Sequence, residues 1–306
     1  MNGLALARAY YETCGKPMIE AHFADVSDRI AVGLVGHGSE CFGFDDTLSQ
    51  DHDFAPGFCL WLTEEDDCAF GFRLFRAYRA LPDTFAGTSL QQKSLRGANG
   101  RGVQTIREFY SFYTETGDIP ESNRAWLAIP DFYLAEATNG AVFSDPVGEF
   151  TRIREGLLRR PADVRYKKLG SALFYMAQTG QYNYARCLQH GEKTAAAIAL
   201  ADFCRHTAEA LFLLCDRYAP YYKWLFRALR TLPDCVQTAE ALEQLLAAPY
   251  EQARNQTVIE EIAGTVQERL RRTGLCTCRD SYLEPYAYEI QKQIRDGDLR
   301  TLPVML

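Results

Sequence analysis

The sequence predicts an α+β fold in two domains, a mixed domain over residues 1–150 and an all-helical bundle over residues 151–306. Three observations lead to this prediction. The chain has 306 residues, which is more than one domain of ordinary size usually holds. Short apolar runs rich in β-branched residues occur in the first half, and long amphipathic segments fill the second half. The first pattern is typical of buried strands, and the second is typical of helices that pack on a common core.

The first domain is expected to mix helices and strands. Pro56 and Gly57 predict a bend in its second strand, and Pro82 ends the helix that follows. The expected segments are an amphipathic helix over Leu4–Phe23, a buried strand over Ile30–Gly36, a strand within 52–62, a helix within 68–81, a glycine-rich basic loop over 89–102, a strand within 103–110, and a strand over 141–145 after the turn Thr138–Gly140.

The second domain is expected to be a bundle, because its apolar residues recur at helical spacing. The clearest segment is 197–218, in which Leu200, Phe203 and Leu211 fall on one face and Arg205 and His206 on the other. Further helices are predicted over 221–232, 239–248, 258–271 and 281–296.

Composition narrows the classes of function. The net charge of −7 argues against a general nucleic-acid binder, because phosphate neutralisation requires a surplus of Lys and Arg; a neutral or cationic acceptor is easier to accommodate. Ten scattered cysteines are expected to be reduced, since a chain of this length does not need disulfides to fold. The chain has no apolar run of ~18 residues, so we expect no membrane association and a cytoplasmic protein.

A glycine–serine pair followed by two aspartates is the main chemical motif. The backbone N–H groups of a turn at Gly38 and Ser39, placed after a buried strand, can hold phosphate oxygens. If the segment around Asp51 is a strand, the carboxylates of Asp51 and Asp53 point to the same side, ~7 Å apart. Two carboxylates plus substrate phosphates are what Mg²⁺ commonly requires. Asp45 and Asp46 are expected to be caps or solvated charges, and His52 to be structural.

These residues resemble the signature of the nucleotidyltransferase superfamily, the polymerase-beta-like fold. That signature is a Gly-Ser pair, often a further glycine, and then Asp-x-Asp about a dozen residues later. In this chain the residues are Gly38, Ser39, Gly43, Asp51 and Asp53, with eleven residues between Ser39 and Asp51. The resemblance implies a nucleotidyltransferase-like mixed sheet with flanking helices.

Other phrases of the chain are similar to an uncharacterised bacterial family that joins such a domain to a helical C-terminal domain of unknown function (DUF4037 type). They are SQDHDF, NGAVFSDP, GQYNYAR, YAPYYKW and DGDLRTLPVML. This second resemblance implies a fold and a reaction class, but no established substrate.

The resemblance also implies a third carboxylate on a later strand, and here the chain departs from the pattern. The corresponding strand is expected within 103–110, where Gln104 occupies a corresponding position and Glu108 is the nearest acid. Glu108 is therefore the candidate third carboxylate, and Asp131 and Glu136 are alternatives. An inactive site stays open as a second interpretation.

Four residues of the helical domain are candidates for nucleotide binding. Tyr182, Asn183 and Arg186 fall within one helical turn, and Lys223 lies between aromatic residues. Burial of Arg186 or Lys223 near the bundle core would require an anionic partner. A nucleotide in a cleft between the domains would supply one, and so would a local Asp or Glu. Aromatic residues at helical spacing are core residues more often than platforms on which a base stacks.

The predicted function is a Mg²⁺-dependent nucleotidyltransferase, with one or two ions, that transfers a nucleoside monophosphate from a triphosphate, ATP being the expected one. The acceptor is a hydroxyl of a small molecule or a protein. The alternative is a protein that has the same fold but is a nucleotide-binding pseudoenzyme or an antitoxin-like, partner-binding protein.

Overall fold

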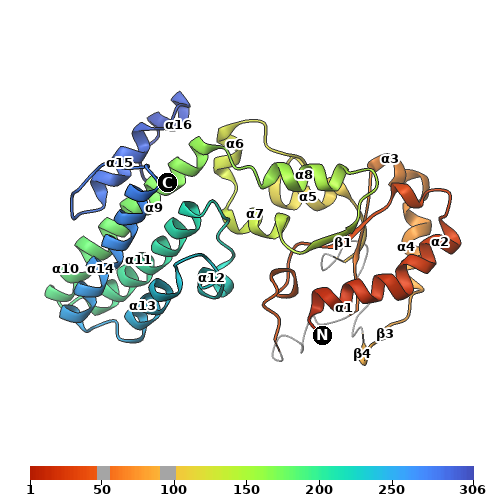
Figure 1. Ribbon diagram of the computed structural model, residues 1–306, viewed down its shortest axis with the longest axis horizontal. Coiled ribbons are helices and arrows are strands. Elements are labelled where there is room, and N and C mark those ends of the chain that lie inside the picture. Colours follow the sequence, from red (N-terminus) through yellow and green to blue (C-terminus); the bar gives the residue numbers. More distant parts are fainter. Residues whose placement is uncertain (47–55, 90–100) are drawn as a thin grey trace. The chain divides into compact units, whose positions relative to one another are not determined.

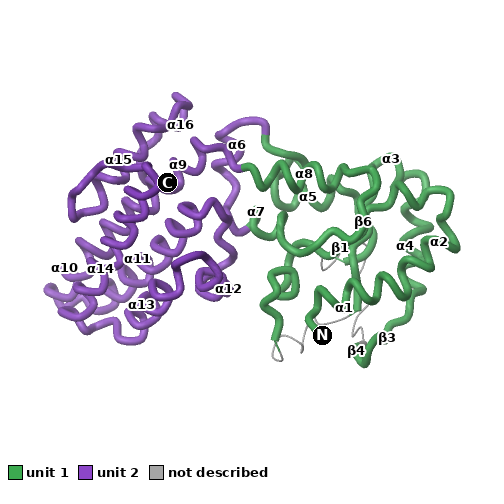
Figure 2. Tube along the Cα trace, in the orientation of Figure 1, with its two compact units in different colours: residues 1–120, 133–159 green, residues 121–132, 160–306 purple. Residues whose placement is uncertain are grey.

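A computed structural model describes residues 1–46, 56–89 and 101–306 of the chain. The chain forms two compact units (Figures 1 and 2). Unit 1 comprises residues 1–120 and 133–159, and unit 2 comprises residues 121–132 and 160–306. The fold is α+β as predicted, with a small mixed sheet and many helices.

Unit 1 carries all the strands of the described part of the chain. Its helical segments are α1 (Gly3–Tyr10), a π turn (Tyr11–Gly15), α2 (Lys16–His22), 3₁₀ turns at Ser27–Arg29 and Glu40–Phe42, α3 (Glu64–Asp66), a π turn (Asp67–Gly71), α4 (Phe72–Arg79), α5 (Ile106–Thr114), α7 (Asp131–Thr138, which begins in unit 2) and α8 (Glu149–Leu157). The strands are β1 (Ala31–Leu34), β2 (Cys59–Leu62), β3 (Thr84–Phe85), β4 (Thr88–Ser89), β5 (Gly102–Thr105) and β6 (Ala141–Ser144).

The main sheet has four strands in the order β5-β2-β1-β6. Strand β1 pairs antiparallel with both neighbours, and β2 pairs parallel with β5 in the register Leu60–Val103. The β1–β6 register shifts between Val32 and Gly33. A second, two-stranded sheet pairs β3 with β4. The sheet is therefore mixed, as the resemblance implied.

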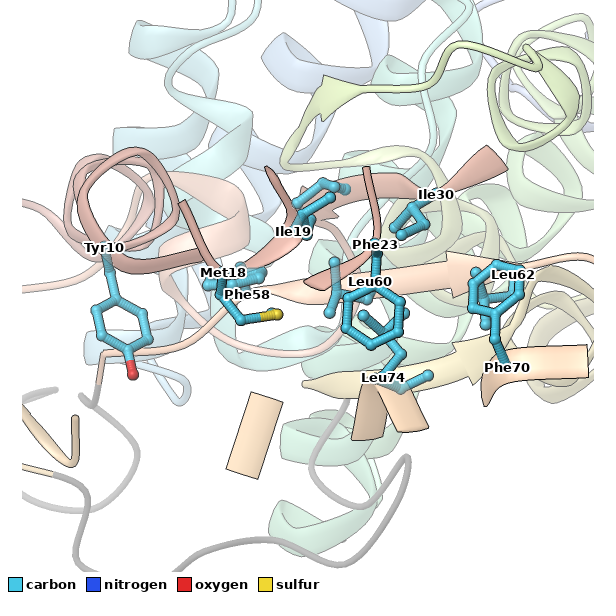
Figure 3. Close-up of a cluster of buried hydrophobic side chains, with 12 residues drawn as sticks. Tyr10, Met18, Ile19, Phe23, Ile30, Phe58, Leu60, Leu62, Phe70 and Leu74 are labelled. Carbon is cyan, nitrogen blue, oxygen red and sulfur yellow. The ribbon is translucent and has the colours of Figure 1, made fainter. Parts of the chain in front are cut away.

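Alternation along the strands divides the core of unit 1 into two faces. On one face, Phe58, Leu60 and Leu62 pack with Ile30, Val32 and Val103 under helices α1, α2 and α4 (Figure 3). On the other face, the buried Trp61 stacks on Phe150 of α8 with ring centroids 3.9 Å apart, and it meets the edge of Phe109 of α5. Helices thus cover both faces, which explains why β1 and β2 are apolar throughout.

Unit 2 is helical in all its described elements. Helix α9 packs against both α11 and α15, and α11 also contacts α13 and α14. The elements are α6 (Asn123–Ala128), α9 (Ala162–Met176), a π segment (Ala177–Tyr184), α10 (Ala185–Gln189), α11 (Lys193–Leu214), α12 (Tyr222–Leu229), α13 (Val236–Ala247), α14 (Gln252–Arg272), α15 (Glu284–Lys292) and α16 (Gly297–Thr301).

The expected segments are mostly confirmed, with three differences. The strand predicted within 103–110 ends at Thr105, where α5 begins with a capping box. The boundary at residue 150 is replaced by one at 159/160, because Phe150 anchors α8 to the sheet, and residues 121–132 join unit 2. His206 is buried and stacks on Tyr175, although its spacing placed it on the polar face. No helix in the described ranges is long and apolar enough to cross a membrane.

Candidate functional site

The candidate site is the glycine loop, defined here as residues 36–43, which follows strand β1. Gly36 and Gly38 have φ of +117° and +121°, and Gly43 has φ of +68°. A 3₁₀ turn over Glu40–Phe42 lies between the last two glycines. Non-glycine residues adopt such φ values at a cost. The Gly-Ser motif therefore forms a tight turn directly after a buried strand, as predicted.

The turn before β6 holds the glycine loop in place. The amide hydrogen of Gly36 is donated to Asn139 Oδ1 at 2.8 Å, and Asn139 Nδ2 donates to the carbonyl oxygen of Gly36 at 2.8 Å. The amide of Gly140 donates to the carbonyl oxygen of Cys41 at 2.8 Å. The side-chain amide of Asn139 thus makes the two hydrogen bonds to Gly36 that a neighbouring backbone would make in a sheet. Sequence reasoning identified a turn here but not this role.

A buried ion pair lies under the loop. Arg101 Nη2 donates to Glu40 Oε1 at 2.7 Å, and both side chains are largely shielded from water. Burial alone lowers the pKa of Arg101, but the charge and hydrogen bond of Glu40 outweigh burial, so the pKa lies above its ordinary value. Burial and the Glu40 charge raise the pKa of the neighbouring Cys41 thiol, which stays protonated. The pair fixes the 3₁₀ turn to the segment that leads into β5.

Gly38 and Gly43 give a matched test of this arrangement. A Cβ at Gly38 would lie 2.6 Å from both carboxylate oxygens of Glu40, whereas a Cβ at Gly43 would meet no atom within 4 Å. We expect Gly43→Ala to cost about 1 kcal/mol through its left-handed backbone alone. Gly38→Ala should cost about 3 kcal/mol or more, because backbone strain adds to the disruption of a buried ion pair. Chemical denaturation measures both free energies of unfolding.

Equal destabilisation by the two substitutions would contradict the role given to Glu40. A second comparison checks the ion pair itself: Arg101→Lys keeps the charge but loses the planar geometry of the guanidinium, so its cost should fall below that of Arg101→Ala.

The loop presents amide hydrogens that have no acceptor among the described residues. Within residues 1–46, 56–89 and 101–306, the structure pairs no acceptor with the amide hydrogens of Gly38 and Ser39. The Ser39 side chain makes no capping bond to the turn that it precedes. Both residues are half-buried. Two unpaired amides and a hydroxyl at a turn are the groups that bind phosphate oxygens in many proteins.

One buried carboxylate lies beside the loop. Glu136 on α7 is 6% exposed, and its Oε1 lies 3.3 Å from Nδ1 of the exposed His37. Burial, followed by the Glu136 charge, raises the pKa of Tyr113, whose hydroxyl faces Gly36. Of the three sequence candidates for a third carboxylate, Glu136 is the one that the structure brings to the glycine loop.

The other two candidate acids have structural partners. Glu108 Oε2 accepts the amide hydrogen of Thr105 at 2.8 Å and so closes the capping box of α5. Asp131 pairs with Lys168 at 2.7 Å and with Arg160 at 3.1 Å, all within unit 2. Gln104 is buried on β5, and its Nε2 has no hydrogen-bond partner among the described residues. The pattern Thr105-x-x-Glu108 was a readable capping signal.

The sequence candidates of the helical half lie in unit 2, and their environment differs from the expectation. Arg186 and Lys223 are exposed, so neither is a buried cation that requires an anion. Each rests on a neighbouring ring, Arg186 over Tyr182 at 5.1 Å and Lys223 over Trp224 at 5.0 Å. Asn183 is half-buried on the π segment.

Unit 2 has a cavity next to Tyr222, but none of the four candidate side chains lines it. That cavity, of about 420 Å³, is lined by Lys168, Arg205, His206, Tyr221 and Tyr222 among others, but not by Lys223, Arg186, Tyr182 or Asn183. The participation of the four residues in nucleotide binding stays a prediction.

The predicted metal ligands Asp51 and Asp53, and His52 between them, lie outside the described residues. In the described part of the chain, no group of three or more His, Cys, Asp or Glu could hold a metal ion. Glu40 is engaged with Arg101 and Glu136 lies against His37. The binding of magnesium and a nucleotide at this loop, with Asp51 and Asp53 as metal ligands, stays a prediction. Asp45 accepts the amide hydrogen of Gly3 at 2.7 Å, a capping role as expected.

Comparison with known protein families identifies a domain in one part of the chain. Residues 126–225 match a domain of unknown function, DUF4037. No curated protein matches the chain. The DUF4037 segment includes Glu136, Asn139 and the four candidates of unit 2, while the glycine loop and the two aspartates precede it. The predicted resemblance to this domain is thereby confirmed for residues 126–225, and the domain's description names no activity.

Proposed function

We propose that the protein is a Mg²⁺-dependent nucleotidyltransferase that transfers a nucleoside monophosphate from a nucleoside triphosphate to a hydroxyl group. The observation that carries the proposal is the glycine loop: two amide hydrogens and the Ser39 hydroxyl at a turn, held after a buried strand by Asn139 and by the Glu40–Arg101 pair. The mixed sheet around β1 and β2 supports it.

In this proposal the protein's own groups bind and orient the triphosphate. Gly38 and Ser39 donate to phosphate oxygens, and the fixed loop keeps these donors in place before the substrate arrives, so no reorganisation is needed during the reaction. An acceptor hydroxyl, from a small molecule or a protein, attacks the α-phosphorus in line, and pyrophosphate leaves. Glu136, buried beside the loop, is the described carboxylate best placed to accept the proton of the hydroxyl.

Asp51 and Asp53 are the proposed ligands of one or two Mg²⁺ ions. The ion, when bound, neutralises charge on the triphosphate as the new bond forms. ATP is the expected triphosphate. Four residues of the helical part remain predicted contributors to nucleotide binding: Tyr182, Asn183, Arg186 and Lys223. Each of them is exposed or half-buried.

A second candidate function is a nucleotide-binding pseudoenzyme or a partner-binding, antitoxin-like protein with the same fold. The observation that favours it is Gln104, a buried neutral amide on β5 where active relatives are expected to carry an acid, with an Nε2 left unpartnered in the described structure. A carboxamide cannot serve as a base or as an anionic metal ligand.

Binding and turnover separate the two functions. Calorimetry with ATP, GTP, CTP and UTP, each with Mg²⁺ and with EDTA, should show Mg²⁺-dependent binding of at least one nucleotide in either case. The transferase should then release pyrophosphate with a suitable acceptor from a panel of aminosugars, other polyols and proteins, whereas the pseudoenzyme should release none. If the protein is a transferase, Gln104→Glu should not increase its turnover, because Glu136 and not residue 104 is the proposed general base.

The absence of binding to all four nucleotides, together with unchanged thermal stability of Asp51→Asn, would exclude the transferase and the nucleotide-binding pseudoenzyme. Glu136→Gln checks the proton-accepting role. It should lower turnover by about 100-fold, the usual contribution of a general base, and leave the affinity for nucleotide within a few-fold.

A further inference from the structure

Two cysteines of unit 2 meet at the ends of two helices. Cys215 is the C-cap of α11, and Cys235 is the N-cap of α13. Each is next to a residue with a left-handed backbone, Asp216 with φ of +51° and Asp234 with φ of +56°. Such backbone positions are uncommon outside glycine and asparagine. Cys215 and Arg269 line the same cavity, and Arg269 contacts the sulfur of Cys235, so the two cysteines lie near one another.

An arginine completes the cluster. Arg269 of α14 donates from Nη1 to the sulfur of Cys235 at 3.2 Å, and from Nη2 to the carbonyl oxygens of Pro233 and Asp234 at 2.8 and 2.6 Å. The guanidinium thus holds the turn before α13 and places a positive charge at the two sulfurs. Arg217, just after α11, adds a second positive charge near Cys215.

The two thiols differ in access. Cys235 is completely buried. Cys215 is half-buried and forms part of the wall of a cavity of about 720 Å³, which is within the range of small-molecule sites. The charged residues that line the same cavity are Asp234, Glu261, Glu268, Arg269 and Arg272. A small polar reagent in the cavity therefore meets Cys215, whereas Cys235 is shielded from solvent.

The two thiols also differ in ionisation. The hydrogen bond from Cys235, helped by Arg269 and opposed by burial, lowers the pKa of Cys215 to about 6. The same hydrogen bond raises the pKa of Cys235, which stays a thiol and acts as the donor. The lowered pKa favours the thiolate of Cys215, the form that attacks electrophiles.

We propose that Cys215 and Cys235 are a peroxide-sensitive thiol pair, in which Cys215 reacts with a hydroperoxide and Cys235 resolves the product to a disulfide. In the first step the Cys215 sulfur attacks the distal oxygen of the hydroperoxide, the O–O bond breaks, and the leaving oxygen takes a proton from water. In the second step the Cys235 sulfur attacks the sulfenic sulfur of Cys215, the S–O bond breaks, and water leaves with the Cys235 proton. The thiols lose two electrons, and the hydroperoxide gains them.

The first experiment treats the full, reduced chain with one equivalent of hydrogen peroxide and maps its peptides without reduction. The expected result is a peptide pair joined through Cys215 and Cys235, with the intact mass lower by two hydrogens. Cys68, an exposed thiol of unit 1, is the internal control and should stay reduced. Oxidation of Cys68 without a link between Cys215 and Cys235 would overturn the proposal.

Variants separate the two roles. Cys235→Ser should leave Cys215 trapped as a sulfenic acid that a dimedone probe labels, and Cys215→Ser should prevent oxidation at both positions. Both changes replace sulfur with oxygen at nearly the same size, so folding should be kept. Equal labelling of Cys215 in the parent and in Cys235→Ser would show that Cys235 does not resolve it.

The pH profile of alkylation tests the role of Cys235 independently of peroxide. The rate at which iodoacetamide modifies Cys215 should reach half its maximum near pH 6 in the parent. In Cys235→Ala, which removes the donor, the midpoint should move toward the ~8.5 of an ordinary thiol, and Cys235→Ser should restore part of the shift through its hydroxyl. A parent midpoint at the ordinary value would contradict the proposed thiolate.

Discussion

Asp51→Asn and Asp53→Asn should each weaken Mg²⁺-dependent nucleotide binding and turnover by about 100-fold or more, the scale on which removal of one group that stabilises developing charge lowers enzymatic rates. The physical reason is that each change removes a proposed carboxylate ligand of the ion. If both acids hold the ion, they repel each other without Mg²⁺, so either substitution should slightly raise the melting temperature of the nucleotide-free protein.

Asp45→Asn is the matched control for these two substitutions. Asp45 lies a few residues before the pair, and its Oδ2 accepts the amide hydrogen of Gly3 at the start of α1. The asparagine oxygen can still accept this hydrogen bond, so the change should cost less than ~1 kcal/mol of stability and leave nucleotide affinity unchanged. Melting curves with and without Mg²⁺ decide the matter: destabilisation by Asp51→Asn and Asp53→Asn in both conditions, with no response of the parent to Mg²⁺, would assign the pair a structural role.

Trp61→Ala should destabilise unit 1 by about 3–5 kcal/mol, the usual cost of removing a large buried aromatic side chain. The Trp61 ring is fully buried and stacks on Phe150, the contact that fixes α8 to the sheet. The cavity that the substitution leaves would therefore weaken the packing of both the sheet and helix α8.

Two controls define the origin of that loss. Trp61→Phe should cost much less, because it keeps an aromatic ring and because Trp61 Nε1 has no hydrogen-bond partner within the described residues. Phe72→Ala removes an aromatic ring that is 66% exposed and should change stability by ~0.5 kcal/mol or less. Far-UV circular dichroism during denaturation is the suitable measurement, since the loss of a tryptophan alters fluorescence. A cost for Trp61→Ala no larger than that for Phe72→Ala would contradict the packing described.

Local patterns in the sequence predicted most elements correctly. The apolar run at Ile30–Gly36 contains β1, the strand expected at 141–145 contains β6, and the amphipathic segment 197–218 forms most of α11. These predictions succeeded because period and composition depend on neighbours within one or two turns of chain. The start of α5 was missed because residues typical of strands, such as Val103 and Ile106, occur on both sides of Thr105, although the capping signal of Thr105 and Glu108 is present in the sequence.

The sequence by itself determined the α+β class, the tight turn at Gly38 and Ser39, and the DUF4037 resemblance, which is confirmed for residues 126–225. The tertiary structure alone decided which side chains surround that turn: Arg101 meets Glu40 across 61 residues, and Asn139 meets Gly36 across 103. It also decided that Glu136 lies at the loop, that Arg186 and Lys223 are exposed, and that Cys215 lies near Cys235. The physical reason is that a turn or a helix is specified by adjacent residues, whereas a buried pair is specified by the packing of elements distant in the chain, which leaves no periodic trace in either partner.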